Sequence, residues 1–226
     1  MPNRARLRPA CLSLLLAGLL GAAAAQPAAA ASMTFKLQGP AQDCAACFWI
    51  LAEGEIDRST PGRFEAFLAR TPDPPRLVRL NSHGGLIVYG TRLGQMIREG
   101  GFDTVVGRVK IRRGDGRAET QFSNCFSACT LAFLGGVRRR VDGGDFGIHR
   151  PAVDQARVGR AVDAEEIRQA MRLSGYLIAA YVAQMGVDPD FITRSFAGPD
   201  IRLLDHDDLV RLKVVTDGAG KPAPPG

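Results

Sequence analysis

Two kinds of segment alternate along the first half of the chain. Short apolar runs typical of buried strands lie at residues 48–54, 76–82 and 103–108. Between them, segments 59–70 and 83–101 carry apolar residues at helical spacing. Strand, helix and strand in this order predict an α/β fold of repeated βαβ units, with a mainly parallel sheet and flanking helices.

The second half predicts further helices around this sheet. A polar, glycine-containing segment at 110–121 is expected to be an inserted loop. A long helix is expected from Asp163, where Glu166 three residues later completes a capping-box pattern. Segment 188–198 predicts a short helix, and segment 205–215 predicts another that ends in a strand.

The N-terminus has the layout of a secretory signal peptide. Three arginines precede the short apolar run Ala10–Leu20, and small residues follow it. We expect cleavage near Ala25 or Ala31, with Ala31 preferred, so that residues 1–31 are the signal peptide. The run is shorter than the roughly 20 residues that span a bilayer, although an uncleaved anchor is the alternative.

The remaining chain is expected to be one exported domain. Residues 32–218 are long enough for a single sizeable core, and residues 219–226 predict a disordered tail. The expected location is periplasmic or secreted, with no stable membrane insertion after cleavage of the signal. Half of the formal net charge of +6 belongs to the signal arginines, and no basic cluster is interleaved with aromatic residues. We therefore expect no nucleic-acid partner.

Four cysteines remain after the signal. Cys44, Cys47, Cys125 and Cys129 are disulfide candidates because an exported protein meets an oxidising compartment. The sequence does not choose among the three pairings. Free buried thiols and a zinc site are the alternatives, and the spacing of Cys44 and Cys47 suits zinc. We expect no metal and no cofactor.

Ser127 opens an apolar helical run, "SACTLAFLGG". A serine at a helix N-terminus lies beside free backbone amides, and the helix dipole there favours developing negative charge. Such a place suits a nucleophile with an oxyanion hole, and it equally suits a serine that only caps the helix.

Two further features make Ser127 a candidate nucleophile. Gly84 and Gly85 directly follow a predicted buried strand, and glycines let backbone amides approach a ligand closely. His149 ends another short apolar run, and histidine is the usual base for a serine nucleophile. The alternatives are an ordinary glycine turn and a histidine that is satisfied by backbone groups.

The order of these motifs resembles the Clp protease proteolytic subunit family, within the crotonase-like superfamily. "LNSHGG" is similar to that family's "NSPGG" strand end, with His83 in place of proline. "FSACTLAFLGG" is similar to its nucleophile helix, and "FGIHRP" is similar to its histidine segment. The resemblance runs from about Phe48 to Asp217 and implies a ClpP/crotonase-like fold.

The resemblance also implies a mechanism of acyl transfer. Ser127 would be the nucleophile and His149 the base, while amides near Gly84, Gly85 and Ala128 would hold the oxyanion. The family's acidic residue falls on Ser195 in this chain, so Asp200 is the displaced candidate for the third catalytic residue. A Cys125–Cys129 bridge would flank the nucleophile, with Cys44–Cys47 as a matching local pair unless the pairs cross.

Together these observations predict that the chain is an exported serine hydrolase. The preferred interpretation is an ATP-independent peptidase. Its substrate would be a peptide or an unfolded protein, and no ATPase partner is expected because the exported protein has no ATP supply. The sequence leaves open whether the protein assembles into a homo-oligomer. The alternatives are a catalytically weak or inactive binding or scaffold protein on the same fold, and an acyl ester or thioester hydrolase.

Overall fold

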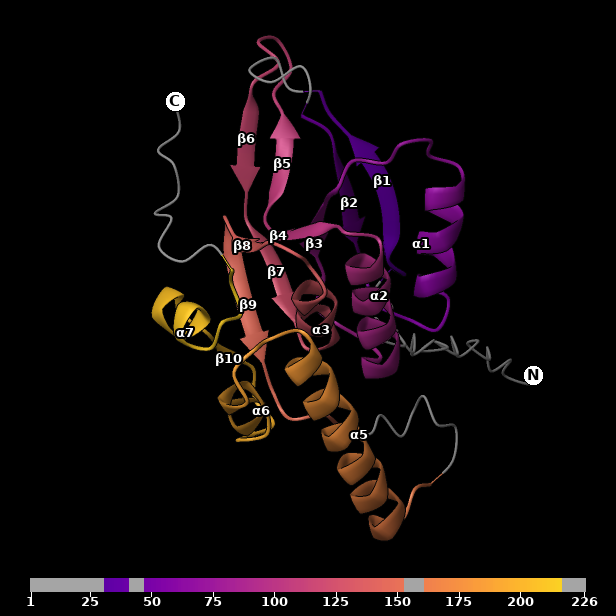
Figure 1. Ribbon diagram of the computed structural model, residues 1–226, viewed down its shortest axis with the longest axis vertical. Coiled ribbons are helices and arrows are strands. Elements are labelled where there is room, and N and C mark those ends of the chain that lie inside the picture. The colour runs from indigo at the N-terminus through magenta and orange to yellow at the C-terminus, as the bar shows by residue number, and fades with distance from the viewer. Residues whose placement is uncertain (1–30, 41–46, 153–160, 217–226) are drawn as a thin grey trace, which may run out of the picture.

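A five-stranded sheet forms the centre of the molecule in the computed structural model, which describes residues 31–40, 47–152 and 161–216 (Figure 1). The strands lie in the order β1-β2-β3-β4-β8. Strands β2, β3, β4 and β8 pair in parallel, and β1 is antiparallel to β2. Their bounds are Thr34–Gln38 for β1, Trp49–Glu53 for β2, Leu77–Asn81 for β3, Asp103–Val106 for β4 and Arg139–Val141 for β8.

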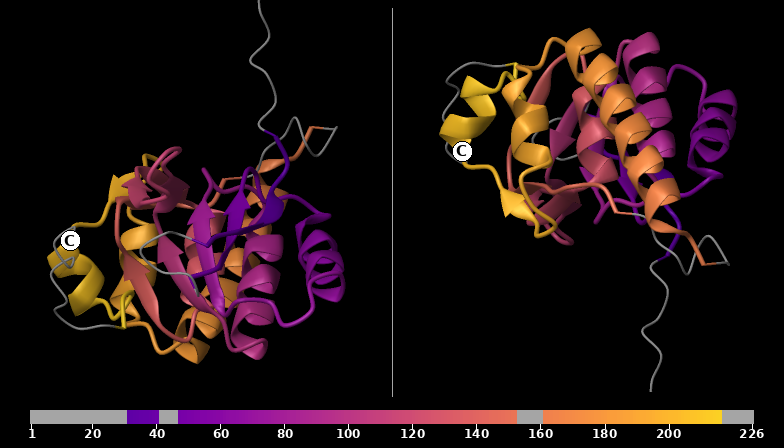
Figure 2. Two further views of the ribbon diagram at one scale, coloured as in Figure 1. Left: turned by 90° about the horizontal axis from the view of Figure 1, so that it is seen from above. Right: turned by 90° about the horizontal axis from the view of Figure 1, so that it is seen from below.

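Helices cover one face of this sheet and pack against apolar residues of its strands. Helix α1 (Thr60–Ala69) connects β2 to β3, and helix α2 (Ile87–Glu99) connects β3 to β4. Figure 2 shows α1 and α2 beside the long helix α5 (Ala164–Gln184). The apolar residues of these helices and strands form one buried cluster, which includes Ile50, Ala52, Phe64, Val78, Leu80, Leu93 and Ile97.

A second sheet carries the segments on either side of the candidate nucleophile and base. Its order is β10-β9-β7, with β7 at Ser123–Phe126, β9 at Gly144–Ile148 and β10 at Arg202–Leu203. Strands β7 and β9 are parallel, and β10 is antiparallel to β9. An isolated bridge between Ser82 and Cys125 joins the end of β3 to β7. The two sheets therefore meet where the glycine pair follows β3.

The segment predicted to be an inserted loop is instead a β-hairpin. Strands β5 (Arg108–Ile111) and β6 (Ala118–Gln121) pair antiparallel. None of their residues is fully buried, so the hairpin has no apolar face that a sequence pattern would reveal. The hairpin is held by the backbone hydrogen bonds between β5 and β6, and polar residues can form such bonds as readily as apolar residues.

The remaining helices follow the sequence expectations closely. Asp163 and Glu166 form the predicted capping box at the start of α5. Helices α6 (Asp190–Ser195) and α7 (His206–Arg211) come next. The strand expected after α7 is not present, because Leu212–Val214 end α7 in a turn whose apolar side chains enter the core. Among the described residues, no helix is both long and apolar enough to cross a membrane.

Three sequence expectations concern residues that the structure does not describe. Nearly all of the signal peptide at 1–31 lies outside the described residues, as do Cys44 and the tail at 219–226. The proposed signal, cleavage site and tail therefore stay predictions. The mixed α/β class of the fold agrees with the sequence pattern. The pattern predicted a single, mainly parallel sheet, whereas the described strands form three sheets.

Candidate active site

Ser127 lies at the sharp turn between β7 and helix α3 (Ala128–Leu134), and its backbone is strained. Its φ of 54° and ψ of −126° lie in a region that residues other than glycine rarely adopt. The turn is held because the Ser127 amide donates to the Gly147 carbonyl at 3.0 Å. Thr130 donates from both its amide and its hydroxyl to the Ser127 carbonyl. Strain of this kind concentrates at functional sites.

A disulfide spans this turn. Cys125 in β7 and Cys129 in α3 are bonded to each other, and both are fully buried. This bond confirms one of the open pairings, and it excludes these two sulfurs as zinc thiolates. Cys47 is also disulfide-bonded, and Cys44 lies outside the described residues.

The glycine pair packs against Ser127. Gly84 has a φ of 104°, and a Cβ atom built on it would lie 2.6 Å from the Phe126 carbonyl oxygen and 2.7 Å from Ser127 Cβ. Gly85 has a φ of 139° and is equally restricted by the Ile56 carbonyl. Only glycine fits at these two positions, so the chain after β3 passes directly beside the candidate nucleophile.

Two backbone amides near Ser127 are available to a ligand. Within the described part of the chain, neither the Gly85 amide nor the Ala128 amide donates a hydrogen bond to the protein. The Ala128 amide is free because the first amides of a helix have no partner inside the helix. By contrast, the Gly84 amide donates to Ser82 Oγ at 3.1 Å, so it is already used. Of the three predicted oxyanion residues, Gly85 and Ala128 therefore keep a free donor.

His149 follows β9 and lines the same small cavity as Ser127. The cavity has a volume of about 30 Å³, enough for one water-sized group. His149 is half-buried, and its Nδ1 lies 2.9 Å from the Arg150 carbonyl oxygen. No hydrogen bond joins Ser127 Oγ to His149 among the described residues; such contacts are often long before substrate binds. The other lining residues are Ile87, Thr130, Leu131, Ile148, Pro151, Ile178, Phe191 and Ser195.

The two candidates for the acidic position have different surroundings. Ser195 lines the cavity and is 7% exposed, and its hydroxyl donates to the Phe191 carbonyl at 2.8 Å. Asp200 is exposed and does not line the cavity. His83 is also exposed, and its Nε2 lies 3.1 Å from Asn124 Nδ2, outside the cavity. The structure thus brings Ser127, His149 and Ser195 together and leaves Asp200 and His83 outside.

Sequence reasoning missed the residues that support the turn. Thr130 fixes the Ser127 carbonyl, and its place three residues after a helix-opening serine is a usable signal for such a bond. Ser82 holds the Gly84 amide. Ile178 and Phe191 come from distant helices, and nothing in the sequence near Ser127 indicates that they line its cavity.

Two arginines, the half-buried Arg98 and the buried Arg139, fix the far end of helix α3. Arg98 and Arg139 both donate to the carbonyls of Leu134 and Gly136, which the helix itself leaves unpaired. Burial lowers the pKa of Arg139 to about 10, and the nearby Arg98 charge contributes to this shift. Because both ends of α3 are fixed, the Ser127 turn has little freedom to relax its strain.

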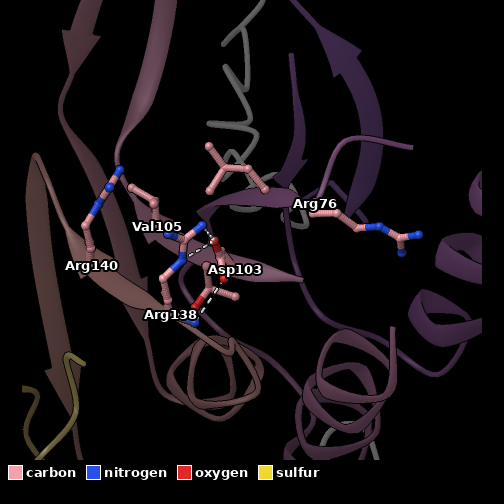
Figure 3. A pocket seen from close by; sticks show the side chains of 7 residues that line it. Arg76, Asp103, Val105, Arg138 and Arg140 are labelled. Atoms are coloured by element: carbon pink, nitrogen blue, oxygen red, sulfur yellow. Dashed lines mark hydrogen bonds and ion pairs between the residues drawn. The ribbon is translucent and has the colours of Figure 1, made fainter. Parts of the chain in front are cut away.

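Hollows larger than the Ser127 cavity lie elsewhere on the described part of the molecule. One, of about 270 Å³, is lined by three arginines (Figure 3). There Arg138 pairs with Asp103, while Arg76 and Arg140 point away from each other, so the charges do not converge on a single point. Another is an apolar groove of about 540 Å³ between α1, α2 and α5. It shares Ile87 with the small cavity, which makes the two hollows neighbours.

Comparison with known proteins gives similarity to solved structures only. No family model matches the chain, and no curated protein matches it. A mutant of ClpP1 from Listeria monocytogenes is 19% identical, with 74% of this chain and 88% of that chain covered and a TM-score of 0.48. A mutant of the 1510-N membrane-bound stomatin-specific protease is 14% identical, with 73% and 75% covered and a TM-score of 0.48.

Proposed function

We propose that this chain is an exported serine hydrolase with a ClpP/crotonase-like fold, and in the first place an ATP-independent peptidase. The observation that carries the proposal is the backbone of Ser127, which is strained and held beside Gly84 on the rim of a cavity that His149 also lines. A serine that only caps a helix needs none of these features. Here the Ser127 side chain makes no capping bond.

The reaction would be acyl transfer through a covalent intermediate. Ser127 Oγ attacks the substrate carbonyl while His149 Nε2 takes its proton, and the carbonyl π electrons move onto the oxygen. The free amides of Gly85 and Ala128 would bind that oxyanion. His149 then gives the proton to the leaving group, and a water molecule repeats the sequence to release the acid.

The proposed setting is outside the cytoplasm. The signal-like residues 1–31 and the Cys125–Cys129 disulfide support export, since disulfides persist in oxidising compartments. There the enzyme has no ATP, so we propose short peptides or already unfolded chains as substrates.

An acyl ester or thioester hydrolase is the second candidate. The observation that favours it is the apolar groove beside the small cavity, which is large enough for an acyl chain and meets the cavity at Ile87. Peptide and acyl-ester substrates of matched chain length, assayed in parallel, would distinguish the two.

Labelling with a fluorophosphonate, which reacts with activated serines, tests the proposal. We expect the oxidised protein to be labelled, and we expect Ser127→Ala and His149→Ala to lose the label. Ser59→Ala is the matched control, since Ser59 is exposed and lies outside the cavity. If the folded, oxidised protein is not labelled, Ser127 has only a structural role in the turn. That result would favour the binding or scaffold alternative.

A further inference from the structure

The contact between His149 and Arg150 points to the nitrogen of the imidazole that carries the proton. His149 Nδ1 lies 2.9 Å from the Arg150 carbonyl oxygen. A carbonyl oxygen can only accept, so Nδ1 must be the donor. The neutral ring then has its lone pair on Nε2, which is the form that can take a proton from a serine.

Backbone bonds hold the chain on both sides of His149, up to the Arg150 amide. Ile148, just before His149, pairs with Arg202 in the β9–β10 ladder. Just after it, the Arg150 amide donates to the Gly198 carbonyl at 2.8 Å. His149 therefore sits on a short stretch of backbone that is anchored before and after it.

The same backbone pattern moves Asp200 away from the histidine. The β9–β10 register pairs Ile148 with Arg202, and its continuation would set Asp200 opposite Arg150. Instead Arg150 bonds to Gly198, so the intervening Pro199 and Asp200 bulge out of the ladder. Asp200 is accordingly exposed. Ser195, the other candidate, already donates its hydroxyl to Phe191.

We propose that the backbone carbonyl of Arg150 orients His149, in the role for which a carboxylate was expected. The catalytic part of this inference rests on the proposed serine hydrolase function. A carbonyl fixes the tautomer and the ring direction as a carboxylate does. It carries only a partial charge, so it stabilises the imidazolium less, and within the described part of the chain Ser127 and His149 work as a dyad with a backbone positioning group.

The first test reads the tautomer directly and needs no activity. The oxidised protein with ¹⁵N-labelled histidine is studied by NMR at a pH where the ring is neutral, and His149→Gln assigns its signals among the three histidines. We expect a protonated Nδ1 and an unprotonated Nε2. A ring protonated at Nε2 instead would overturn the proposal.

The second test asks whether Asp200 contributes to the reaction. We expect Asp200→Asn to change the fluorophosphonate labelling rate by less than about threefold, whereas loss of an orienting acid costs several orders of magnitude. Asp207→Asn is the matched control, since Asp207 is also exposed and lies on α7. A larger, Asp200-specific loss would give Asp200 the orienting role and contradict the proposal.

The two tests separate this inference from the proposed function. If the protein does not label but His149 carries its proton on Nδ1, the serine hydrolase proposal fails and the positioning by Arg150 stands as a structural finding. If the protein labels and His149 is protonated on Nε2, the hydrolase proposal stands and the positioning role fails.

Discussion

Gly84 lies so close to Ser127 that a Cβ atom at position 84 would come within 2.7 Å of the Ser127 Cβ. Gly84 follows β3 of the central sheet and Ser127 follows β7 of the second sheet, and their contact exists because the end of β3 bridges to β7 at Ser82 and Cys125. The free Gly85 amide is thereby brought beside the candidate nucleophile. This contact is the basis of the first prediction.

Gly84→Ala is expected to remove the reactivity of Ser127. The methyl group collides with Phe126 and Ser127 in a backbone conformation with φ of 104° that disfavours any side chain. We expect the fluorophosphonate labelling rate to fall about 100-fold or more, as when one oxyanion donor is lost. Gly62→Ala is the control, since a Cβ there meets open space in α1. Equal labelling of the two variants would contradict this close approach of Gly84 to Ser127.

The Cys125–Cys129 disulfide is expected to stabilise both the fold and the Ser127 turn. Its two cysteines are four residues apart, and closing so short a loop contributes about 2 kcal/mol in the chain-entropy model. The double variant Cys125→Ala/Cys129→Ala should lose about that much free energy of unfolding in a denaturant titration, and it should label more slowly. Unchanged stability together with an unchanged labelling rate would show that the bond has no such role.

Asp57 is expected to make the fold sensitive to acid. Burial alone would raise the pKa of Asp57, but hydrogen bonds from Ser32, Arg63 and Ser59 outweigh it and hold that pKa well below its usual value. A carboxyl with a depressed folded-state pKa contributes stability that is fully present above its unfolded pKa of about 4 and is lost as the pH falls below it.

Asp57→Asn should therefore lower the free energy of unfolding by about 2 kcal/mol at pH 7 and flatten its pH dependence below about pH 4. Urea titrations at several pH values measure both effects. Asp207→Asn serves as the control because Asp207 is exposed on α7. The idea fails if the Asp57 variant keeps the acid sensitivity of the unmodified protein.

Arg139 is expected to be irreplaceable even by lysine. It is 3% exposed, and within the described part of the chain its guanidinium donates to backbone carbonyls alone, which belong to Leu134, Gly136, Met185, Lys213 and Val214. Lysine keeps the charge but has no planar fork, so several of these buried acceptors would lose their partner. We expect Arg139→Lys to cost about 3 kcal/mol in the free energy of unfolding.

The neighbouring exposed Arg140 provides the matched control. Arg140→Lys should change the free energy of unfolding by less than about 0.5 kcal/mol, as surface substitutions usually do. Similar losses for both lysine variants would mean that the network of carbonyls around Arg139 contributes little.

Much of the chain's local structure could be read from its sequence. The apolar periods of segments 59–70 and 83–101 predicted α1 and α2 because a helix must turn one face toward a core. Asp163 and Glu166 predicted the start of α5 because their side chains satisfy the first amides of that helix. The hairpin of β5 and β6 escaped prediction because it buries no face.

The sequence by itself determined which residues are candidates for chemistry at this site. A serine before an apolar helix, a glycine pair after a strand and a histidine after another strand are local patterns that stand in the printed chain. Each depends on a few neighbouring residues, so each could be recognised without knowing how the chain folds.

Only the tertiary structure decided how these candidates lie relative to one another. The parallel pairing of β7 with β9 sets Ser127 and His149 on one cavity, and the contact of Arg150 with Gly198 turns Asp200 outward. Such contacts join residues far apart in the chain, and strand register and bulges depend on packing across the whole sheet. A local pattern cannot encode them, because the energy that selects them comes from residues outside the pattern.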